Sequence, residues 1–134
     1  MDRLSPAQRS QVMSRIRSKN STPELIVRRL VHRMGFRYRL HVRQLPGCPD
    51  LVFPSRRKIL MVNGCFWHQH ERCPLARPPQ SNKGYWGPKL TGNQRRDYIN
   101  GRRLQALGWK VLTVWECQLD DVDHVIERVS AFLM

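Results

Sequence analysis

The amino-acid sequence predicts an α/β fold in which a mixed β-sheet is covered by helices on both faces. Four short segments have the apolar patterns of strands, and the first three of them are separated only by turns. A long helical segment at 88–107 separates the third strand from the fourth, and a connection of that kind joins two parallel strands. The sheet is therefore expected to combine an antiparallel meander with one parallel strand.

The strands are recognised by alternating or continuous apolar residues. They are predicted at 36–41 (FRYRLH), 50–53 (DLVF), 58–62 (KILMV) and 109–115 (WKVLTVW). In the first strand, Phe36, Tyr38 and Leu40 alternate with basic residues, so one of its faces is expected to meet water. The third strand is apolar after its first residue, which indicates burial on both faces.

The helices are recognised by the residues at which they begin and end. They are predicted at 5–19, from the N-cap Thr22 to Gly35, at 88–107 and at 121–133. Thr22 is followed by Pro23, which suits the first helical position, and Gly35 suits the left-handed residue that ends a helix. Apolar residues of the last helix recur at helical spacing, and this stripe is expected to face the core.

The length of 134 residues fits one domain with its own hydrophobic core. Residues 1–20 are expected to form an arm that docks on DNA, because the helix at 5–19 is basic and carries few apolar residues. The sequence has no apolar run long enough to cross a bilayer and no apolar leader of the secretory type at its start. These features predict a cytoplasmic protein.

The charge of the chain indicates a nucleic-acid partner. Lys and Arg number 24 against 10 Asp and Glu, which gives a formal net charge of +14, and such a balance is typical of proteins that bind nucleic acids. A ribosome-type or merely soluble basic protein is the alternative. A carboxylate on a surface meant for phosphate is then conspicuous, because it repels the ligand unless a metal ion or a proton lies between them.

Cysteine and histidine residues cluster in an irregular segment at 63–87. Cys65, His70 and Cys73 lie close together in it, and Cys117 follows the last predicted strand. Zinc takes four such ligands in a tetrahedron, and a ligand from the far end of the sheet would hold the irregular segment in place. The alternative is a set of ordinary buried cysteines beside a surface histidine.

One aspartate at the start of the second predicted strand is a candidate catalytic residue. Asp50 follows a proline turn, at a strand end where side chains project beyond a sheet. A carboxylate there is suited to hold Mg²⁺ against a phosphate group. The alternative is an aspartate that favours the turn by bonding its own backbone.

Several segments of the chain resemble a known family of nucleases. The order α-β-β-β-α-β, with Pro-Asp at the second strand, resembles the restriction-endonuclease-like, PD-(D/E)xK-type fold. A closer resemblance is carried by LPGCPD (45–50), GCFWHQH (64–70), YW (85–86), NQRRD (93–97), LGW (107–109) and VWEC (114–117). These segments are similar, in register over nearly the whole chain, to the bacterial very short patch repair (Vsr) endonucleases, which nick DNA at T:G mismatches left by deamination of 5-methylcytosine.

The resemblance implies a role for each matching residue. Asp50 and the backbone carbonyl of Val62 would bind a catalytic Mg²⁺, and His68 would be the general base that takes a proton from the attacking water. Glu24 and Asp97 would hold waters around that metal. The structural zinc ligands would be Cys65, His70, Cys73 and Cys117.

These roles have simpler alternatives. Glu24 also suits a helix N-terminus through the helix dipole, and Asp97 also suits an ion pair with a neighbouring arginine. His68 is the alternative to His70 as a zinc ligand. Asn63 stands where the best-known family members have a histidine that supports the metal waters, and an asparagine side chain does not titrate.

The irregular loop and the helices also hold candidate residues for DNA recognition. Phe66, Trp67 and Trp86 would be exposed on the irregular loop and would enter the base stack as wedges, at a cost that is lower at a mismatch. The alternative is that these rings form a small core over the zinc. The resemblance implies that Met13 would insert from the opposite groove and that Lys89 and Asn93 would read the edges of the mismatched pair.

The expectation is thus a monomeric, Mg²⁺-dependent nicking enzyme with a structural zinc. Its substrate would be double-stranded DNA with a T:G mismatch, and other mismatch-repair proteins would be its partners. One alternative is a non-catalytic zinc-containing DNA-binding module, which has no need of Asp50 and His68 together. Another is a nuclease of the same fold with a different mismatch or sequence target.

Overall fold

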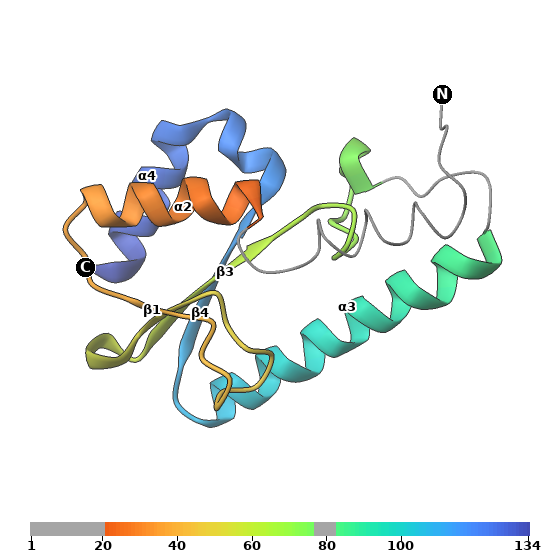
Figure 1. Cartoon of the computed structure of the whole chain (residues 1–134), viewed down its shortest axis with the longest axis horizontal. Coiled ribbons are helices and arrows are strands. Elements are labelled where there is room, and N and C mark those ends of the chain that lie inside the picture. Colours follow the sequence, from red (N-terminus) through yellow and green to blue (C-terminus); the bar gives the residue numbers. More distant parts are fainter. Residues whose placement is uncertain (1–20, 77–82) are drawn as a thin grey trace.

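The computed structural model describes residues 21–76 and 83–134 (Figure 1). Its helices are α2 (Thr22–Arg33), α3 (Lys83–Ala106) and α4 (Val122–Leu133), and its strands are β1 (Arg39–Leu40), β2 (Leu51–Phe53), β3 (Lys58–Asn63) and β4 (Lys110–Trp115). Short 3-10 helices lie at Pro54–Arg56, Pro74–Ala76 and Glu116–Asp120. The arm at 1–20, with the helix expected at 5–19, lies outside the described residues.

The strands of the described residues form one mixed sheet in the order β1-β2-β3-β4. The first three are antiparallel neighbours, and β4 runs parallel to β3 after the connection through α3. Leu60 of β3 pairs with Leu51 on one side and with Leu112 on the other. The sequence-based prediction of a meander followed by one parallel strand is therefore confirmed.

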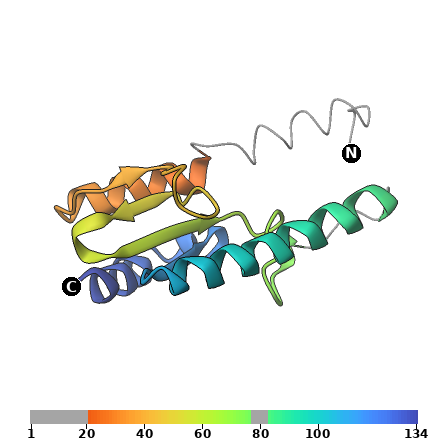
Figure 2. The ribbon, with the colours of Figure 1, turned by 90° about the horizontal axis from the view of Figure 1, so that it is seen from below.

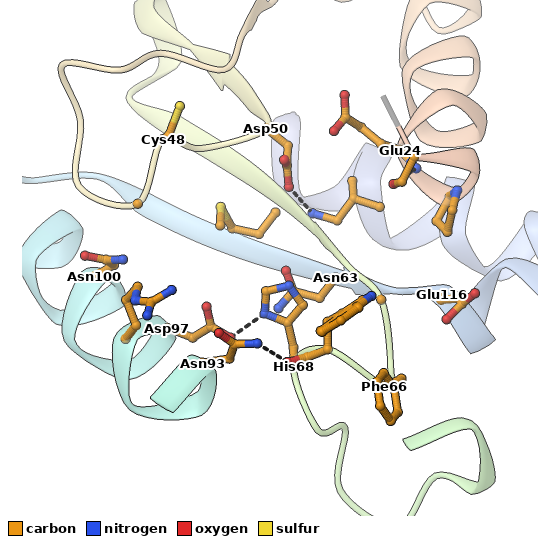
Figure 3. Close-up of a pocket in the computed structure, with 18 of the residues that line it drawn as sticks. Glu24, Cys48, Asp50, Asn63, Phe66, His68, Asn93, Asp97, Asn100 and Glu116 are labelled. Atoms are coloured by element: carbon orange, nitrogen blue, oxygen red, sulfur yellow. Dashed lines mark hydrogen bonds and ion pairs between the residues drawn. The ribbon is translucent and has the colours of Figure 1, made fainter. Parts of the chain in front are cut away.

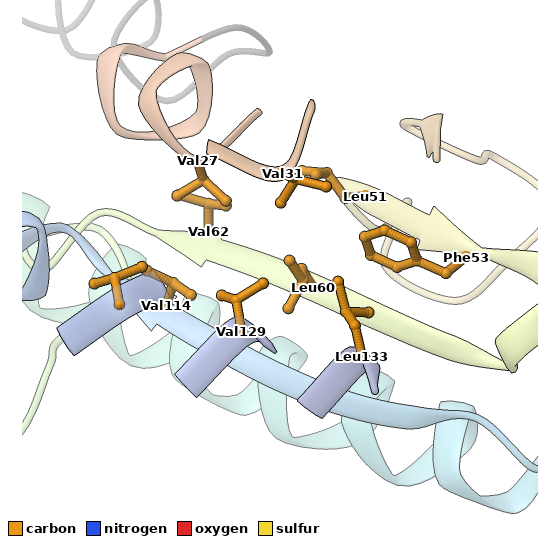
Figure 4. Close-up of a cluster of buried hydrophobic side chains, with 10 residues drawn as sticks. Val27, Val31, Leu51, Phe53, Leu60, Val62, Val114, Val129 and Leu133 are labelled. Carbon is orange, nitrogen blue, oxygen red and sulfur yellow. The ribbon is translucent and has the colours of Figure 1, made fainter. Parts of the chain in front are cut away.

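One face of the sheet is covered by α2 and α4 together (Figures 1 and 4). Leu51, Leu60 and Val114 of the sheet are fully buried there, against Val27 of α2 and Val129 of α4. Burying one such side chain contributes roughly 1.5–3 kcal/mol. This layer therefore holds the start of α2 firmly against the sheet, and with it the acidic residue of the first turn.

The opposite face of the sheet is covered by α3. Val52 and Ile59 of the sheet pack there with Leu104 of α3 and with Trp109. Leu104 lies near the C-terminal end of the helix, and Figure 2 shows that the N-terminal part of α3 extends past the sheet. Neither α3 nor any other helix in the described residues is long and apolar enough to cross a membrane.

The ends of the first helix and the first strand differ from the prediction. Ser21, rather than Thr22, is the N-cap of α2, and its side chain accepts a hydrogen bond from the backbone N–H of Glu24. The strand predicted at 36–41 is reduced to the two residues of β1. It ends at once because the next residue, His41, has a left-handed backbone conformation, with φ of 47°.

The long helix begins earlier than predicted. It starts at Lys83 rather than Pro88, so the proline lies inside α3. A proline removes one backbone hydrogen bond from a helix. The burial of Trp86 and Leu90, which are 1% and 3% exposed, favours helix on both sides of it. Periodicity alone does not reveal this, because the residues against which these side chains pack come from another segment.

Candidate active site

A cleft of about 640 Å³ lies beside the C-terminal end of β3. Its walls come from the start of α2, the start of β2, the loop after β3 and the middle of α3. Figure 3 shows Glu24 and Asp50 on one side of the cleft and His68 and Asp97 on another. Folding therefore brings together the four titratable residues that the family resemblance places at the catalytic metal.

Asp50 directly precedes β2, as its position after the proline turn predicts. Its Oδ2 atom accepts a hydrogen bond of 2.8 Å from the backbone N–H of Val62 on β3. Burial raises the pKa of Asp50 to about 6, against the lowering effect of that hydrogen bond, and the nearby carboxylate of Glu24 raises it too. The charged form of Asp50 is therefore destabilised in the folded chain, and a bound cation would offset this destabilisation.

Glu24 is almost fully buried in the first turn of α2, with 3% of its surface exposed. A buried carboxylate needs partners. Its Oε2 atom lies 2.8 Å from Nε2 of His41 and 3.6 Å from Nη1 of Arg28. His41 lines the same cleft and was missed by sequence reasoning. The antiparallel register that brings it opposite Asp50 was the missing information.

His68, in the loop after β3, contacts Asp97 of α3. The contact joins Nδ1 of His68 to Oδ2 of Asp97 (Figure 3). A carboxylate on Nδ1 fixes the orientation of an imidazole and leaves Nε2 to exchange protons with a substrate or a water molecule. The sequence-based expectation was that Asp97 holds waters around a metal. The structure adds a direct contact between Asp97 and His68.

The oxygen atoms around Asp50 fit a divalent cation. Asp50 offers a second carboxylate oxygen, Oδ1, besides the Oδ2 atom that accepts the hydrogen bond from Val62. The N–H and C=O groups of one strand residue point to the same edge, so the Val62 carbonyl faces Asp50 as well. Asn63, the last residue of β3, is 7% exposed and also lines the cleft. Oxygen donors of this kind suit hard divalent cations.

A second cluster consists of Cys65, His70, Cys73 and Cys117, whose ligand atoms all lie within 4.8 Å of one another. Nδ1 of His70 lies 3.7 Å from Sγ of Cys65 and 3.4 Å from Sγ of Cys117. The edges of a tetrahedral zinc site with nitrogen and sulfur ligands are about 3.5–3.8 Å long. The cluster therefore has the size of a metal site, and His70 rather than His68 faces its sulfurs.

The cluster connects the irregular loop to the sheet. Cys117 follows β4, and its backbone N–H donates to Sγ of Cys65 at 3.4 Å. The ring of His70 is stacked on Trp115 of β4, with 4.1 Å between ring centroids. Burial raises the pKa of the Cys65 thiol to about 12, so a metal that binds there must displace its proton.

The aromatic residues of the loop are not exposed as expected. Trp67 and Trp86 are 4% and 1% exposed, and they pack with Phe66 and Leu90 into a cluster of their own. The expectation of two tryptophans exposed on the loop is therefore wrong for the chain without DNA. Exposing such large rings to water costs more free energy than packing them together.

The two residues of α3 that were assigned to reading the mismatched pair also belong to this region. Asn93 is 4% exposed, and its side-chain amide donates to the backbone carbonyl of Trp67 at 3.1 Å. Nζ of Lys89 lies 5.3 Å from the centroid of the Trp67 ring. Met13 lies outside the described residues.

Known proteins are similar to this chain over most of its length. The profile of the family described as DNA mismatch endonuclease Vsr matches residues 1–74. The type II nicking enzyme V.XorIIP of Xanthomonas oryzae pv. oryzae is 48% identical over 132 residues, which cover 98% of this chain and 96% of that enzyme. The DNA mismatch endonuclease Vsr of Escherichia coli is 38% identical over 113 residues, which cover 84% of this chain and 72% of that protein.

The fold is also found in a solved nuclease structure. The catalytic domain of the homing endonuclease I-Bth0305I matches with a TM-score of 0.56 and 21% identity, covering 84% of this chain and 94% of that domain. At that identity the likeness concerns the fold alone, and it confirms the restriction-endonuclease-like architecture. The family profile and the mismatch and nicking enzymes among the relatives show that the chain is a strand-nicking DNA endonuclease and belongs to the Vsr family.

Proposed function

We propose that this endonuclease hydrolyses one strand of a DNA duplex 5′ to the thymine of a T:G mismatch, in a reaction that depends on Mg²⁺. The observation that carries the proposal is the convergence of Asp50 and the His68–Asp97 pair on one cleft. A phosphodiester hydrolase needs a cation site and a general base at one place. The description of the family and the name of the Escherichia coli relative, both DNA mismatch endonuclease Vsr, favour a mismatch over an intact site.

Asp50 and the Val62 carbonyl are the proposed ligands of the catalytic metal. Magnesium bound there supplies positive charge that offsets the negative charge developing on the phosphate during in-line attack. The buried Asp50 carboxylate, with its raised pKa, is held by the Val62 N–H in a fixed orientation. Glu24 and Asn63 border the same space and orient water within it.

His68 is the proposed general base. Its contact with Asp97 fixes the imidazole through Nδ1, which leaves Nε2 to remove a proton from the attacking water. The negative charge of Asp97 stabilises the imidazolium that forms. The bond between phosphorus and the 3′ oxygen then breaks, and the leaving oxygen takes a proton from solvent to give a 3′-hydroxyl beside a 5′-phosphate. His68 returns the proton that it took from water to solvent.

The loop cluster is proposed to hold one structural zinc ion. Three thiol sulfurs and one imidazole nitrogen are a donor set that zinc prefers. Such an ion ties Cys117, at the end of the sheet, to the loop that carries His68 between Cys65 and His70. The zinc thereby keeps the general base at its place in the cleft.

Phe66, Trp67 and Trp86 are the proposed wedges, and mismatch recognition includes the opening of their cluster. Within the described residues, the buried Nε1 atom of Trp86 has no hydrogen-bond partner. An unsatisfied buried donor costs about 1–3 kcal/mol, and this lowers the free energy needed to move the ring into a base stack. As Trp67 moves, Asn93 and Lys89 are released to contact the mismatched pair, with Met13 approaching from the opposite groove.

The substrate proposal is tested with end-labelled duplexes incubated with Mg²⁺. The panel contains T:G, the other mismatches and an intact pair in several flanking sequences. We expect the monomeric enzyme to make a single nick 5′ to the mismatched thymine, which DNA ligase can reseal. Equal nicking of the intact duplex would replace the mismatch proposal by a sequence-specific nuclease, and binding without any nick would indicate a non-catalytic module.

The role of Asp97 predicts a loss of turnover without a loss of DNA binding. We expect Asp97→Asn to lower kcat by about 100-fold or more, within the range that general base catalysis contributes. The dissociation constant for the T:G duplex is expected to stay within a few fold. Asp123→Asn, which removes an exposed carboxylate from α4, is the matched control. An unchanged kcat in Asp97→Asn would show that His68 needs no carboxylate partner.

A further inference from the structure

Three side chains, one from the first turn of α2 and two from the ends of the β1–β2 connection, converge beside the proposed metal site. A carboxylate oxygen of Glu24, an imidazole nitrogen of His41 and a carboxylate oxygen of Asp50 lie within 4.8 Å of one another. All three residues line the cleft. The family resemblance gives Glu24 a place around the metal but assigns nothing to His41, so the histidine needs its own explanation.

The backbone conformation at His41 costs conformational free energy. Its φ of 47° is left-handed, a conformation that costs a non-glycine residue about 1–2 kcal/mol. Its N–H donates to the backbone carbonyl of Asp50 at 3.1 Å, one residue beyond the last pair of the β1–β2 ladder. The imidazole lies in the cleft with a side-chain exposure of 12%, against a Glu24 side chain that is 4% exposed.

We propose that His41 is a direct nitrogen ligand of the catalytic metal, together with Asp50 and with Glu24, which then binds the metal itself rather than a water molecule. This inference rests on the proposed cation site at Asp50. Two adjacent ligands of an octahedral cation with bonds of 2.0–2.1 Å lie about 3 Å apart, close to the 2.8 Å between Nε2 of His41 and Oε2 of Glu24. The metal takes the place of the hydrogen that these two atoms share, and that proton passes to Nδ1 or to solvent.

The charges around His41 agree with a cation between these groups. The buried Glu24 and the half-buried Asp50 bring two carboxylates together, and Nη1 of Arg28 lies 3.6 Å from Oε2 of Glu24. One guanidinium does not balance two carboxylates, whereas a divalent ion does so with excess charge for a phosphate. Neutral imidazole adds a ligand without adding negative charge that would repel DNA.

The proposed ligand set has two consequences. Three protein side chains retain a metal in the absence of DNA, whereas Asp50 alone needs a DNA phosphate to complete its site. Imidazole is a better ligand for transition metals than for Mg²⁺. The full-length protein is therefore expected to prefer Mn²⁺ to Mg²⁺, and His41→Gln is expected to reduce that preference.

The test is electron spin-echo spectroscopy of Mn²⁺ bound to the zinc-loaded, full-length protein without DNA. Mn²⁺ coordinated by imidazole shows modulation from the bound nitrogen nucleus, which a histidine that only orients Glu24 does not produce. We expect this modulation in the wild type and its loss in His41→Gln. We also expect His41→Gln to weaken Mn²⁺ binding in calorimetry by at least about tenfold, the lower range for loss of a group that merely supports a ligand.

Two further variants separate this inference from the proposed function. His124→Gln removes an exposed histidine at the start of α4 and is expected to keep both the modulation and the affinity. Asp50→Asn is expected to abolish Mn²⁺ binding. Mn²⁺ binding that needs Asp50 but shows no nitrogen modulation would overturn the role of His41 and leave the catalytic site intact. Absence of Mn²⁺ binding in the wild type, even with a T:G duplex, would overturn both.

Discussion

Asp50→Asn is expected to abolish nicking of a T:G duplex while making the metal-free protein more stable. The amide is a weaker metal ligand than a carboxylate, and loss of one charge-stabilising group costs about 100- to 1,000-fold or more in turnover. The Val62 N–H keeps an acceptor, since the asparagine carbonyl replaces the Oδ2 atom that bonds it at 2.8 Å. The fold is therefore expected to survive the substitution unchanged.

The gain in stability follows from the raised pKa of Asp50. The group titrates at about 6 in the folded chain against a usual value of 3.8, so the folded state binds the proton more readily than the unfolded state. The free energy of unfolding of the wild type therefore falls as pH rises from about 4 to about 6. The free energy of unfolding of Asp50→Asn does not fall in this way. At neutral pH the variant is therefore expected to be more stable than the wild type by about 1–3 kcal/mol.

Urea unfolding of both zinc-loaded proteins at several pH values, in buffer without added Mg²⁺, measures this difference. The plots of unfolding free energy against pH for the two proteins are expected to converge below about pH 4, where Asp50 is protonated in both the folded and the unfolded state. Asp120→Asn, in an exposed position before α4, controls for the loss of a carboxylate as such. An Asp50→Asn protein that nicks at the wild-type rate would show that Asp50 is not part of the mechanism.

Loss of the loop metal is the second large effect that we expect. The purified chain is expected to contain about one zinc ion, and Cys117→Ser to lose it together with nearly all nicking activity. Cys117 is the ligand that joins the loop to the end of β4. Without its thiolate the metal loses the ligand that joins the loop to the end of β4. The stacking of His70 on Trp115 is then expected to be too weak to keep His68 in position against Asp97.

The thermodynamic cost is expected to be large because metal binding is coupled to folding of the loop. We expect Cys117→Ser to lower the free energy of unfolding by about 3–5 kcal/mol, the size of the largest single-residue effects. Zinc release on acidification is expected as well, since protons compete for the Cys65 sulfur, whose pKa is raised by burial. Metal analysis and thermal unfolding measure both effects.

Cys48→Ser is the matched control for the zinc experiment. Cys48 is a partly buried thiol that lines the cleft and lies outside the cluster of four ligands. Its replacement is expected to leave the zinc content and the melting temperature unchanged. A Cys117→Ser protein with full zinc content and full stability would show that the four residues do not act as one site.

The order and pairing of the strands could be predicted because local patterns carry that information. Continuous apolar residues at 58–62 indicate a strand covered on both faces, and a long helical segment before 109–115 requires a crossover. The length of β1 and the start of α3 could not be read in this way. The first depends on the left-handed backbone at His41 and the second on the burial of Trp86, and both depend on contacts between distant segments.

Part of the candidate site could also be predicted from the sequence. Asp50 has a local signature, the proline turn before a strand, and His68 was identified through the resemblance of GCFWHQH to the Vsr family. His41 has no such signature, because a histidine at the end of an alternating strand is unremarkable. Only the pairing of β1 with β2 brings it beside Asp50 and Glu24.

The sequence by itself determined that this is a basic α/β protein of the Vsr family, with a mixed sheet, a cluster of metal-ligating residues and a carboxylate at a strand end. The fold class and the cluster follow from composition, periodicity and spacing, which are local, and the family follows from the resemblance of segments such as GCFWHQH and VWEC. The tertiary structure alone decided the partners of each functional side chain: Asp97 on His68, His41 on Glu24, and the tryptophans on each other. Such pairings join residues far apart in the chain, and the packing of α2, α3 and α4 against the two faces of the sheet selects them.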